Sequence, residues 1–158
     1  MFSLIVANTY SQISIHAVFA VAHRDNLIIA PWRDHLHRYI SGVLSSEADY
    51  ALAVGGWKDH VHIFFELKPS QCVSDVLKVV KAKSSGWVNE QGFVKGKFKW
   101  QEGYGAFAHS RSQRHDVIHY IEHQEARHRD KTFRQEYLGM LEAHEIGYQE
   151  QYLFEFFE

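Results

Sequence analysis

The chain has 158 residues, of which 46% are hydrophobic, and its formal net charge is −2 with the histidines neutral. This length fits one domain with a substantial core, and the near-neutral charge excludes a protein that attracts polyanions through a strong overall positive field. A single cysteine, Cys72, excludes a disulfide framework and favours a reducing, cytoplasmic location. The first stretch, MFSLIVANTYSQ, has no signal-peptide pattern and no membrane span. We therefore expect one cytoplasmic domain over residues 1–158 that does not enter a membrane.

The first half of the chain predicts strand, helix, strand and strand. Residues 10–23, YSQISIHAVFAVAH, alternate loosely in polarity and predict a long first strand. Pro31 then opens a helix over residues 31–46, in which apolar residues recur at helical spacing. Residues 48–58 predict a strand and turn, and residues 60–67 predict the neighbouring strand.

The second half predicts a helix, a strand region and two further helices. Ser70, directly after Pro69, is the expected N-cap of the first of these helices. One or two short strands are expected in residues 96–110. Ser112 is the expected cap of a helix over about residues 113–128, and residues 132–146 supply another helix.

The order β-α-β-β-α-β, followed by helices, predicts the fold class. It is the order of a ferredoxin-like (RRM-like) α+β sandwich, an antiparallel sheet with helices on one face. We expect the core to span about residues 10–128 and a C-terminal helical extension to span about residues 130–158.

Two histidines separated by one residue begin the strand in KDHVHIFFEL. Residues i and i+2 of a strand point to the same face, so His60 and His62 project together while Val61 points to the other face. Two neighbouring imidazoles suit a divalent metal that takes two nitrogen ligands. The alternative is an exposed pair without a ligand, and a metal site needs at least a third donor.

The helix expected over residues 113–128 offers that donor. At about 100° per residue, its apolar face is formed by Val117, Ile118 and Ile121. Tyr120 and Gln124, four residues apart, lie together at one edge of this face. If the helix packs beside the strand of His60 and His62, an amide oxygen and a phenol join the two imidazoles. That arrangement suits a metal-polarised phosphodiester attacked by a phenolate.

Three further histidines lie on the opposite side of the same helix, at His115, His119 and His123. Their i, i+4 spacing resembles a metal-ligand pattern. A solvated helix face explains them better, because this side points away from the expected core.

These motifs together resemble a known family. DHVHIFF resembles the HUH motif, two histidines around a hydrophobic residue, and HYIEHQ resembles the tyrosine helix of the single-tyrosine HUH transposases of insertion-sequence-200-like elements. The stretches SQCVSDVLKVVKAKSSGWVNE, FKWQEGYGAFAHS and YIEHQEARHRDKTFRQEY are also similar, in the same order. The resemblance covers roughly residues 10–138.

The resemblance implies a metal-dependent endonuclease and strand transferase. It assigns His60, His62 and Gln124 as ligands of Mg²⁺ or Mn²⁺ and Tyr120 as the nucleophile that forms a 5′-phosphotyrosine link. Members of this family are homodimers that act on single-stranded DNA with hairpin ends. Two other functions remain open: a domesticated relative like the tyrosine transposases associated with repetitive extragenic palindromes (REPs), or a nucleic-acid-binding module without catalysis.

Local basic residues are the candidate DNA contacts, although family members often have a basic cluster after the first strand where this chain has only Arg24. If the resemblance to the family holds, we expect contacts to phosphates from Lys78, Lys81, Lys83, Arg111 and Arg114. Considered without the resemblance, these residues are better explained as solvated surface charges.

The connector AHSRSQR, before the tyrosine helix, is short, polar and without an apolar anchor. It could direct the helix to either subunit of a dimer. We expect the Tyr120 helix of one subunit to meet the His60–His62 strand of the other; the alternative is a helix folded back on its own sheet.

Overall fold

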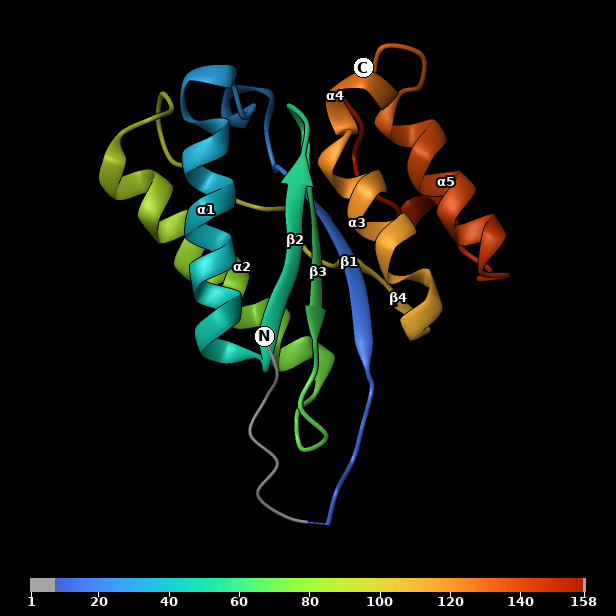
Figure 1. Ribbon diagram of the computed structural model, residues 1–158. Coiled ribbons are helices and arrows are strands. Elements are labelled where there is room, and N and C mark those ends of the chain that lie inside the picture. The colour runs from blue at the N-terminus through green and yellow to red at the C-terminus, as the bar shows by residue number, and fades with distance from the viewer. Residues whose placement is uncertain (1–7, 158) are drawn as a thin grey trace.

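A four-stranded antiparallel sheet forms the centre of the protein, in a computed structural model that describes residues 8–157 (Figure 1). The strand order is β2-β3-β1-β4, and the strands are β1 (Ser14–Ala20), β2 (Tyr50–Gly56), β3 (His60–Glu66) and β4 (Gly105–His109). Together with the two helices between the strands, this order confirms the predicted ferredoxin-like fold. The first strand is shorter than predicted, because its ladder with β3 runs only from Ser14 opposite Glu66 to Ala20 opposite His60.

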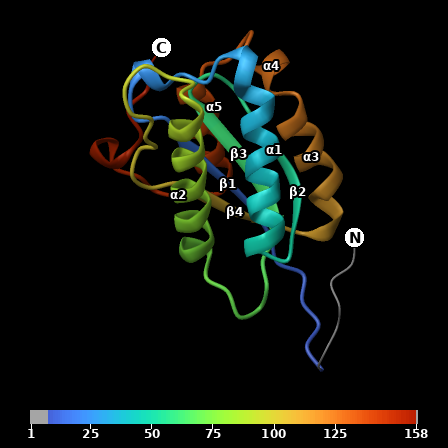
Figure 2. The same cartoon turned by 90° about the vertical axis from the view of Figure 1, so that its left-hand side faces the viewer.

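One face of the sheet is covered by the two long helices α1 (Ala30–Glu47) and α2 (Val73–Gln91), which lie side by side (Figure 2). Alternate strand residues such as Phe19 and Ile63 are fully buried in the large core on this side. The other residues of each strand point to the opposite face, as the two-residue period of a strand requires. The sheet therefore separates an apolar core from a second face.

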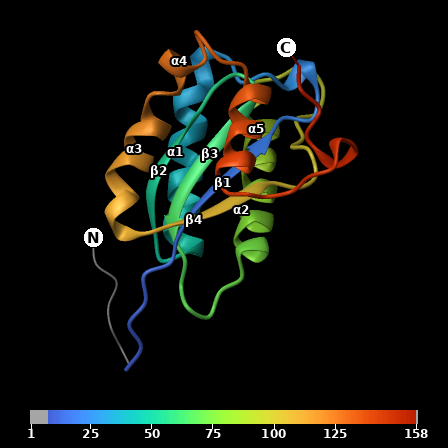
Figure 3. The same ribbon diagram turned by 90° about the vertical axis from the view of Figure 1, so that its right-hand side faces the viewer.

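The helices after β4 cover this second face: α3 (Arg114–Glu122), α4 (Gln124–Arg127) and α5 (Phe133–Ala143) (Figure 3). Phe64 of β3 packs against Val117 and Ile121 of α3. Toward α5, a second cluster of buried hydrophobic residues includes Val18 of β1 and Phe133 of α5. The C-terminal helices were predicted, and the structure places them across the sheet from α1 and α2.

Several helix boundaries differ from the prediction. Pro31 lies in the first turn of α1 as expected, but Cys72, not Ser70, is the N-cap of α2. The loop after Pro69 forms a turn in which the Gln71 side chain bonds the Lys68 amide and the Glu47 carbonyl, so α2 starts later.

The predicted helix over residues 113–128 is divided into two. It is preceded by a 3-10 turn, Arg111–Gln113, whose N-cap is Ser110 rather than Ser112, with Gln113 completing a capping box. At His123 the backbone leaves helical geometry, with φ −114° and ψ 34°. Neither proline nor glycine occurs near this break, so the sequence carries no local signal for it.

Two short 3-10 turns complete the described chain, Arg24–Asn26 and Glu150–Tyr152. Among residues 8–157, no helix is long and apolar enough to cross a membrane. Residues 1–7, the greater part of the stretch assessed for a signal peptide, lie outside the described residues.

Candidate active site

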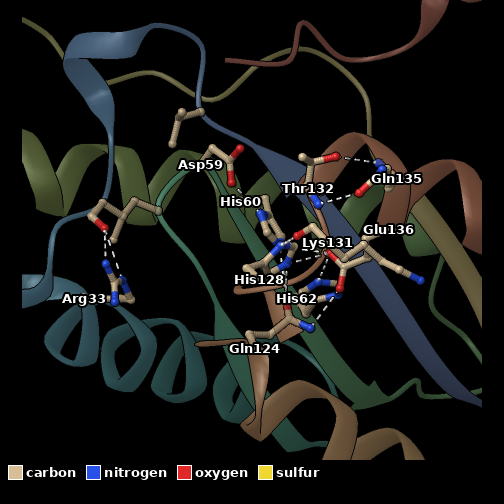
Figure 4. A network of polar contacts seen from close by, with 12 residues as sticks. Arg33, Asp59, His60, His62, Gln124, His128, Lys131, Thr132, Gln135 and Glu136 are labelled. Atoms are coloured by element: carbon tan, nitrogen blue, oxygen red, sulfur yellow. Dashed lines mark hydrogen bonds and ion pairs between the residues drawn. The ribbon is translucent and has the colours of Figure 1, made fainter. Parts of the chain in front are cut away.

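The two histidines of the HVH motif lie on the central strand β3 and are fully buried on the face toward α3 and α5. Val61 between them belongs to the core on the other side of the sheet. The predicted orientation of the pair is therefore confirmed. The Nε2 atoms of His60 and His62 each lie 3.1 Å from the same carboxylate oxygen, Oε1 of Glu136 (Figure 4).

The other ring nitrogen of each histidine has its own partner. His60 Nδ1 lies 2.7 Å from Oδ1 of Asp59, and His62 Nδ1 lies 2.8 Å from Nε2 of the buried His16. A hydrogen bond at one ring nitrogen fixes the orientation of the ring and leaves the other nitrogen for a ligand. Both rings thus present Nε2 to one point between β3, α3 and α5.

Tyr120 and Gln124 reach this point from the helices after β4. The Tyr120 ring lies 5.7 Å from the His62 ring between centroids, and its hydroxyl donates a hydrogen bond to Glu136 Oε2. Gln124 Oε1 lies 3.1 Å from His60 Nε2. The structure brings all four predicted site residues together within one chain.

Close packing of α3 on β2 makes this convergence possible. A Cβ atom added to Gly55 of β2 would lie 2.3 Å from the backbone oxygen of Ile121, next to Tyr120. Only a residue without a side chain lets the helix approach the strand so closely.

Glu136 of α5 is the residue that sequence reasoning missed. It is 3% exposed, and its carboxylate contacts His60, His62, Tyr120 and Gln124. The helix was predicted, but a glutamate on an amphipathic helix is normally solvated. No local pattern distinguishes this one.

His128, directly after α4, was also missed. Its Nε2 lies 3.0 Å from Gln124 Oε1 and 3.2 Å from Glu136 Oε1, and its side chain is almost fully buried. It is the C-cap of α4, the short helix that follows the change of backbone geometry at His123.

The charges at the site are strongly coupled. Burial alone would raise the pKa of Glu136, but the surrounding histidines, His62 foremost, hold it far below its usual range. Burial would lower the pKa of His60, yet hydrogen bonds to Asp59 and Glu136 outweigh burial and raise it to about 9. Burial and the nearby Glu136 carboxylate raise the pKa of Tyr120. The site therefore contains a carboxylate anion stabilised by buried imidazoles.

The donor set fits a divalent metal. One ligand atom each from His60, His62 and Glu136 can be chosen so that the three atoms lie within 4.8 Å of one another. Imidazole nitrogen combined with carboxylate and amide oxygen is a set that Mn²⁺ accepts, and oxygen ligands also suit Mg²⁺. The structure thus adds a carboxylate to the predicted ligands His60, His62 and Gln124.

A cleft of about 430 Å³ opens beside Tyr120 between α3 and α5. His16, Tyr120 and Glu136 line it, together with two cationic residues, Arg127 and Lys131. The Arg127 guanidinium lies 4.3 Å from the centroid of the Tyr120 ring. The cleft lining also contains the carboxylates of Asp116 and Glu136, so Arg127 is the cation that an anionic strand would meet closest to the phenol ring.

The other helical histidines do not take part. His115, His119 and His123 are exposed, and the rings of His119 and His123 stack on each other at 4.0 Å. They lie on the solvent side of the helix, as the periodicity predicted.

The candidate DNA contacts do not line the site. Lys78, Lys81 and Lys83 belong to α2, on the opposite face of the sheet (Figure 1). Lys81 donates to the backbone oxygens of Gln101 and Gly103, and exposed Lys83 pairs with Glu47.

The two arginines near α3 differ from each other. Arg111 is exposed in the 3-10 turn, whereas Arg114 is largely buried and pairs at 3.1 Å with Glu66. The pairing of Arg114 competes with any phosphate contact. DNA contacts by these five basic residues stay a prediction.

In this structure of one chain, α3 packs on the sheet of its own chain. This is the alternative to the expected arrangement, in which the Tyr120 helix packs on the partner subunit. The connector before it is not free, contrary to its polar appearance. Its first residues belong to β4, Ser110 and Gln113 form a capping box, and Arg114 is held by Glu66. These contacts direct the Tyr120 helix to the neighbouring strands.

Comparisons with known proteins bear on the family and the fold of this chain. The sequence model of the family described as "Transposase IS200 like" matches residues 9–124. A candidate transposase from Deinococcus radiodurans R1 has a similar solved structure, with TM-score 0.60 and 19% identity over 77% of this chain and 97% of that chain. A REP-associated tyrosine transposase bound to a REP hairpin is also similar, with TM-score 0.54 and 14% identity over 79% of this chain and 74% of that chain. The comparison with curated proteins finds no significant match. Since the family model covers most of the sequence, the chain belongs to the IS200-like transposase family.

Proposed function

We propose that this protein cuts and rejoins single-stranded DNA through a 5′-phosphotyrosine intermediate on Tyr120. The observation that carries the proposal is the position of the phenol. Its ring lies 5.7 Å from that of His62, beside a buried pair of imidazoles whose Nε2 atoms face one point. A nucleophile next to such a pair suits metal-assisted covalent cleavage of a phosphodiester.

In the cleavage step, the Tyr120 oxygen attacks the scissile phosphorus while the bond from phosphorus to the 3′-oxygen breaks. The phenol loses its proton and the departing 3′-oxygen gains one. The downstream strand remains on Tyr120 through its 5′-phosphate. Because the new phosphodiester keeps the bond energy, a 3′-hydroxyl can later attack it and reseal a strand.

His60, His62 and Gln124 would hold Mg²⁺ or Mn²⁺. When bound, such an ion polarises the scissile phosphate and stabilises the charge that develops on it. The chain's own contribution is to orient the two imidazoles through Asp59 and His16.

The expected substrate is single-stranded DNA with hairpin ends, and the expected assembly is a cytoplasmic homodimer of a single domain spanning residues 1–158. The hairpin in the solved REP-associated relative supports this substrate class. That likeness also keeps the domesticated REP-associated role as the second candidate. The third candidate, a binding module without catalysis, has no use for the buried cluster around Tyr120, which argues against it.

Covalent capture tests the proposal. Labelled single-stranded hairpin DNA is incubated with the protein and Mn²⁺, and adducts are resolved on denaturing gels. We expect an adduct with the wild-type protein and with Tyr104→Phe, the matched control, but none with Tyr120→Phe. An adduct of equal yield in the Tyr120→Phe protein contradicts the assignment.

A further inference from the structure

The carboxylate at the centre of the site comes from beyond the family match, which ends at residue 124. Glu136 belongs to α5, a helix that begins at Phe133. From α5, its side chain points to the second face of the sheet and meets the buried histidines (Figure 4). A buried carboxylate is costly unless it is paired. This one has a separate set of partners at each oxygen.

Oε1 has the position of a metal ligand. It lies 3.1 Å from Nε2 of His60 and 3.1 Å from Nε2 of His62. Neighbouring ligands of an octahedral ion are separated by about 1.4 times the metal–ligand distance, so ligands at about 2.1–2.2 Å lie about 3.0–3.1 Å apart. The two distances from Oε1 to the imidazole nitrogens therefore already match the separation of neighbouring ligands in one coordination shell.

Oε2 faces the nucleophile. It accepts a hydrogen bond from the Tyr120 hydroxyl and another from Nε2 of Gln124 at 3.0 Å. One carboxylate thus touches the two imidazoles through one oxygen and the phenol through the other.

α5 is held firmly in place. The Phe133 ring stacks on the His60 ring at 3.9 Å with an interplanar angle of 4°. Thr132 caps the helix through the Gln135 amide at 3.1 Å. His128 Nε2 lies 3.2 Å from Glu136 Oε1 and supports the carboxylate from a third side. The position of Glu136 is built by several elements and is not the result of one flexible side chain.

We propose that Glu136 is a bridging carboxylate: it ligates the divalent metal through Oε1 and positions the Tyr120 hydroxyl through Oε2. Metal binding and the placement of the phenol are then coupled through one side chain of α5. The inference deepens the proposed function, on which it rests for the role of Tyr120. A carboxylate also supplies the negative charge that two neutral imidazoles and an amide lack opposite a divalent cation.

Calorimetric titration with Mn²⁺ tests the ligand role without DNA. Glu136→Gln keeps the shape of the side chain and removes its charge, and Glu142→Gln changes an exposed glutamate of the same helix. We expect Glu136→Gln to bind Mn²⁺ at least about tenfold more weakly than the wild type, and Glu142→Gln to bind it equally. A folded Glu136→Gln protein with wild-type Mn²⁺ affinity overturns the proposal.

The wild-type protein alone provides a second measurement, which does not depend on the variant folding. In crystals soaked with Mn²⁺, anomalous diffraction should locate the ion about 2.2 Å from Glu136 Oε1. An ion bound to His60 and His62 without Glu136 overturns the ligand role.

The positioning role is followed by NMR of protein labelled with ¹³Cζ-tyrosine, with Tyr120→Phe to assign the signal. Addition of Mg²⁺ should shift the Tyr120 resonance in the wild type and in Glu142→Gln, and leave it unshifted in Glu136→Gln. A Tyr120 signal that responds equally in Glu136→Gln contradicts the coupling. These readouts contain no DNA, so they can succeed even if the covalent capture fails, and the reverse.

Discussion

The rings of Tyr120 and His62 meet within one chain, with centroids 5.7 Å apart and planes at 84°. They belong to α3 and to the central strand β3. Because α3 also packs against β2 of the same sheet, the chain needs no second copy to place the phenol beside the imidazoles. A dimer of this protein would then contain two separate sites.

Mixed dimers should reveal this arrangement. We expect that co-expression of a Tyr120→Phe chain with a His60→Ala, His62→Ala chain restores no cleavage of labelled hairpin DNA, because each site keeps the defect of its own chain. Wild-type chains co-expressed with either mutant serve as the control and should retain activity. Partial recovery of cleavage in the mixture of the two mutant chains would show instead that the Tyr120 helix of one subunit packs on the His60–His62 strand of the other.

A methyl group at Gly55 should displace the Tyr120 helix. Its Cβ would lie 2.3 Å from the Ile121 carbonyl oxygen, a contact that only a backbone shift can relieve. We expect Gly55→Ala to lose about 1–3 kcal/mol of unfolding free energy and most of the cleavage activity.

Gly86→Ala is the matched control, since nothing lies within 4 Å of the added atom on the exposed side of α2. It should gain about 1 kcal/mol and keep its activity. Urea denaturation and the cleavage assay measure both effects. Equal behaviour of the two variants would show that the close approach of α3 is unimportant.

His16 should matter for metal affinity although it does not face the metal position. Its Nε2 lies 2.8 Å from His62 Nδ1, and a ligand at His62 Nε2 requires a partner that takes the Nδ1 proton. We expect His16→Phe, which keeps an aromatic ring but removes its nitrogen atoms, to bind Mn²⁺ about 10–100-fold more weakly. His119→Phe, at an exposed position, should bind it like the wild type. Calorimetry that finds both variants unchanged would remove His16 from the site.

The metal-free protein should lose stability in mildly alkaline solution. The pKa of His60 is raised from 6.5 to about 9 in the folded state, because its bonds to Asp59 and Glu136 outweigh burial. A raised pKa stabilises the fold fully below pH 6.5, and this contribution disappears as the pH rises through about 9. We expect a loss on the order of 3 kcal/mol between these limits.

Denaturant unfolding in the presence of a chelator, from pH 6 to pH 10, measures this effect. His60→Gln, which cannot titrate, is the control and should show a flatter profile. Stability that stays constant or rises over this range in the wild type would contradict the charged state of His60.

The sequence alone was sufficient for the features that depend on local periodicity. A strand turns alternate residues to one face, so His60 and His62 could be paired from their spacing, and a helix aligns residues four apart, so Tyr120 and Gln124 could be placed on one edge. The order of the elements was sufficient for the ferredoxin-like fold, because a chain of this size has few ways to bury its amphipathic helices and strands.

Only the tertiary structure showed which distant residues complete the site and how α3 packs on the sheet of its own chain. Glu136 and His16 reach the histidines from an amphipathic helix and from a neighbouring strand. Neither position carries a local signal, since a glutamate on a helix and a histidine in a strand are equally compatible with solvent. The backbone break at His123 likewise has no breaking residue. Such features follow from long-range packing, in which Gly55 and the Arg114–Glu66 pair hold α3 on its own sheet. Contacts between residues far apart in the chain leave no period in the sequence.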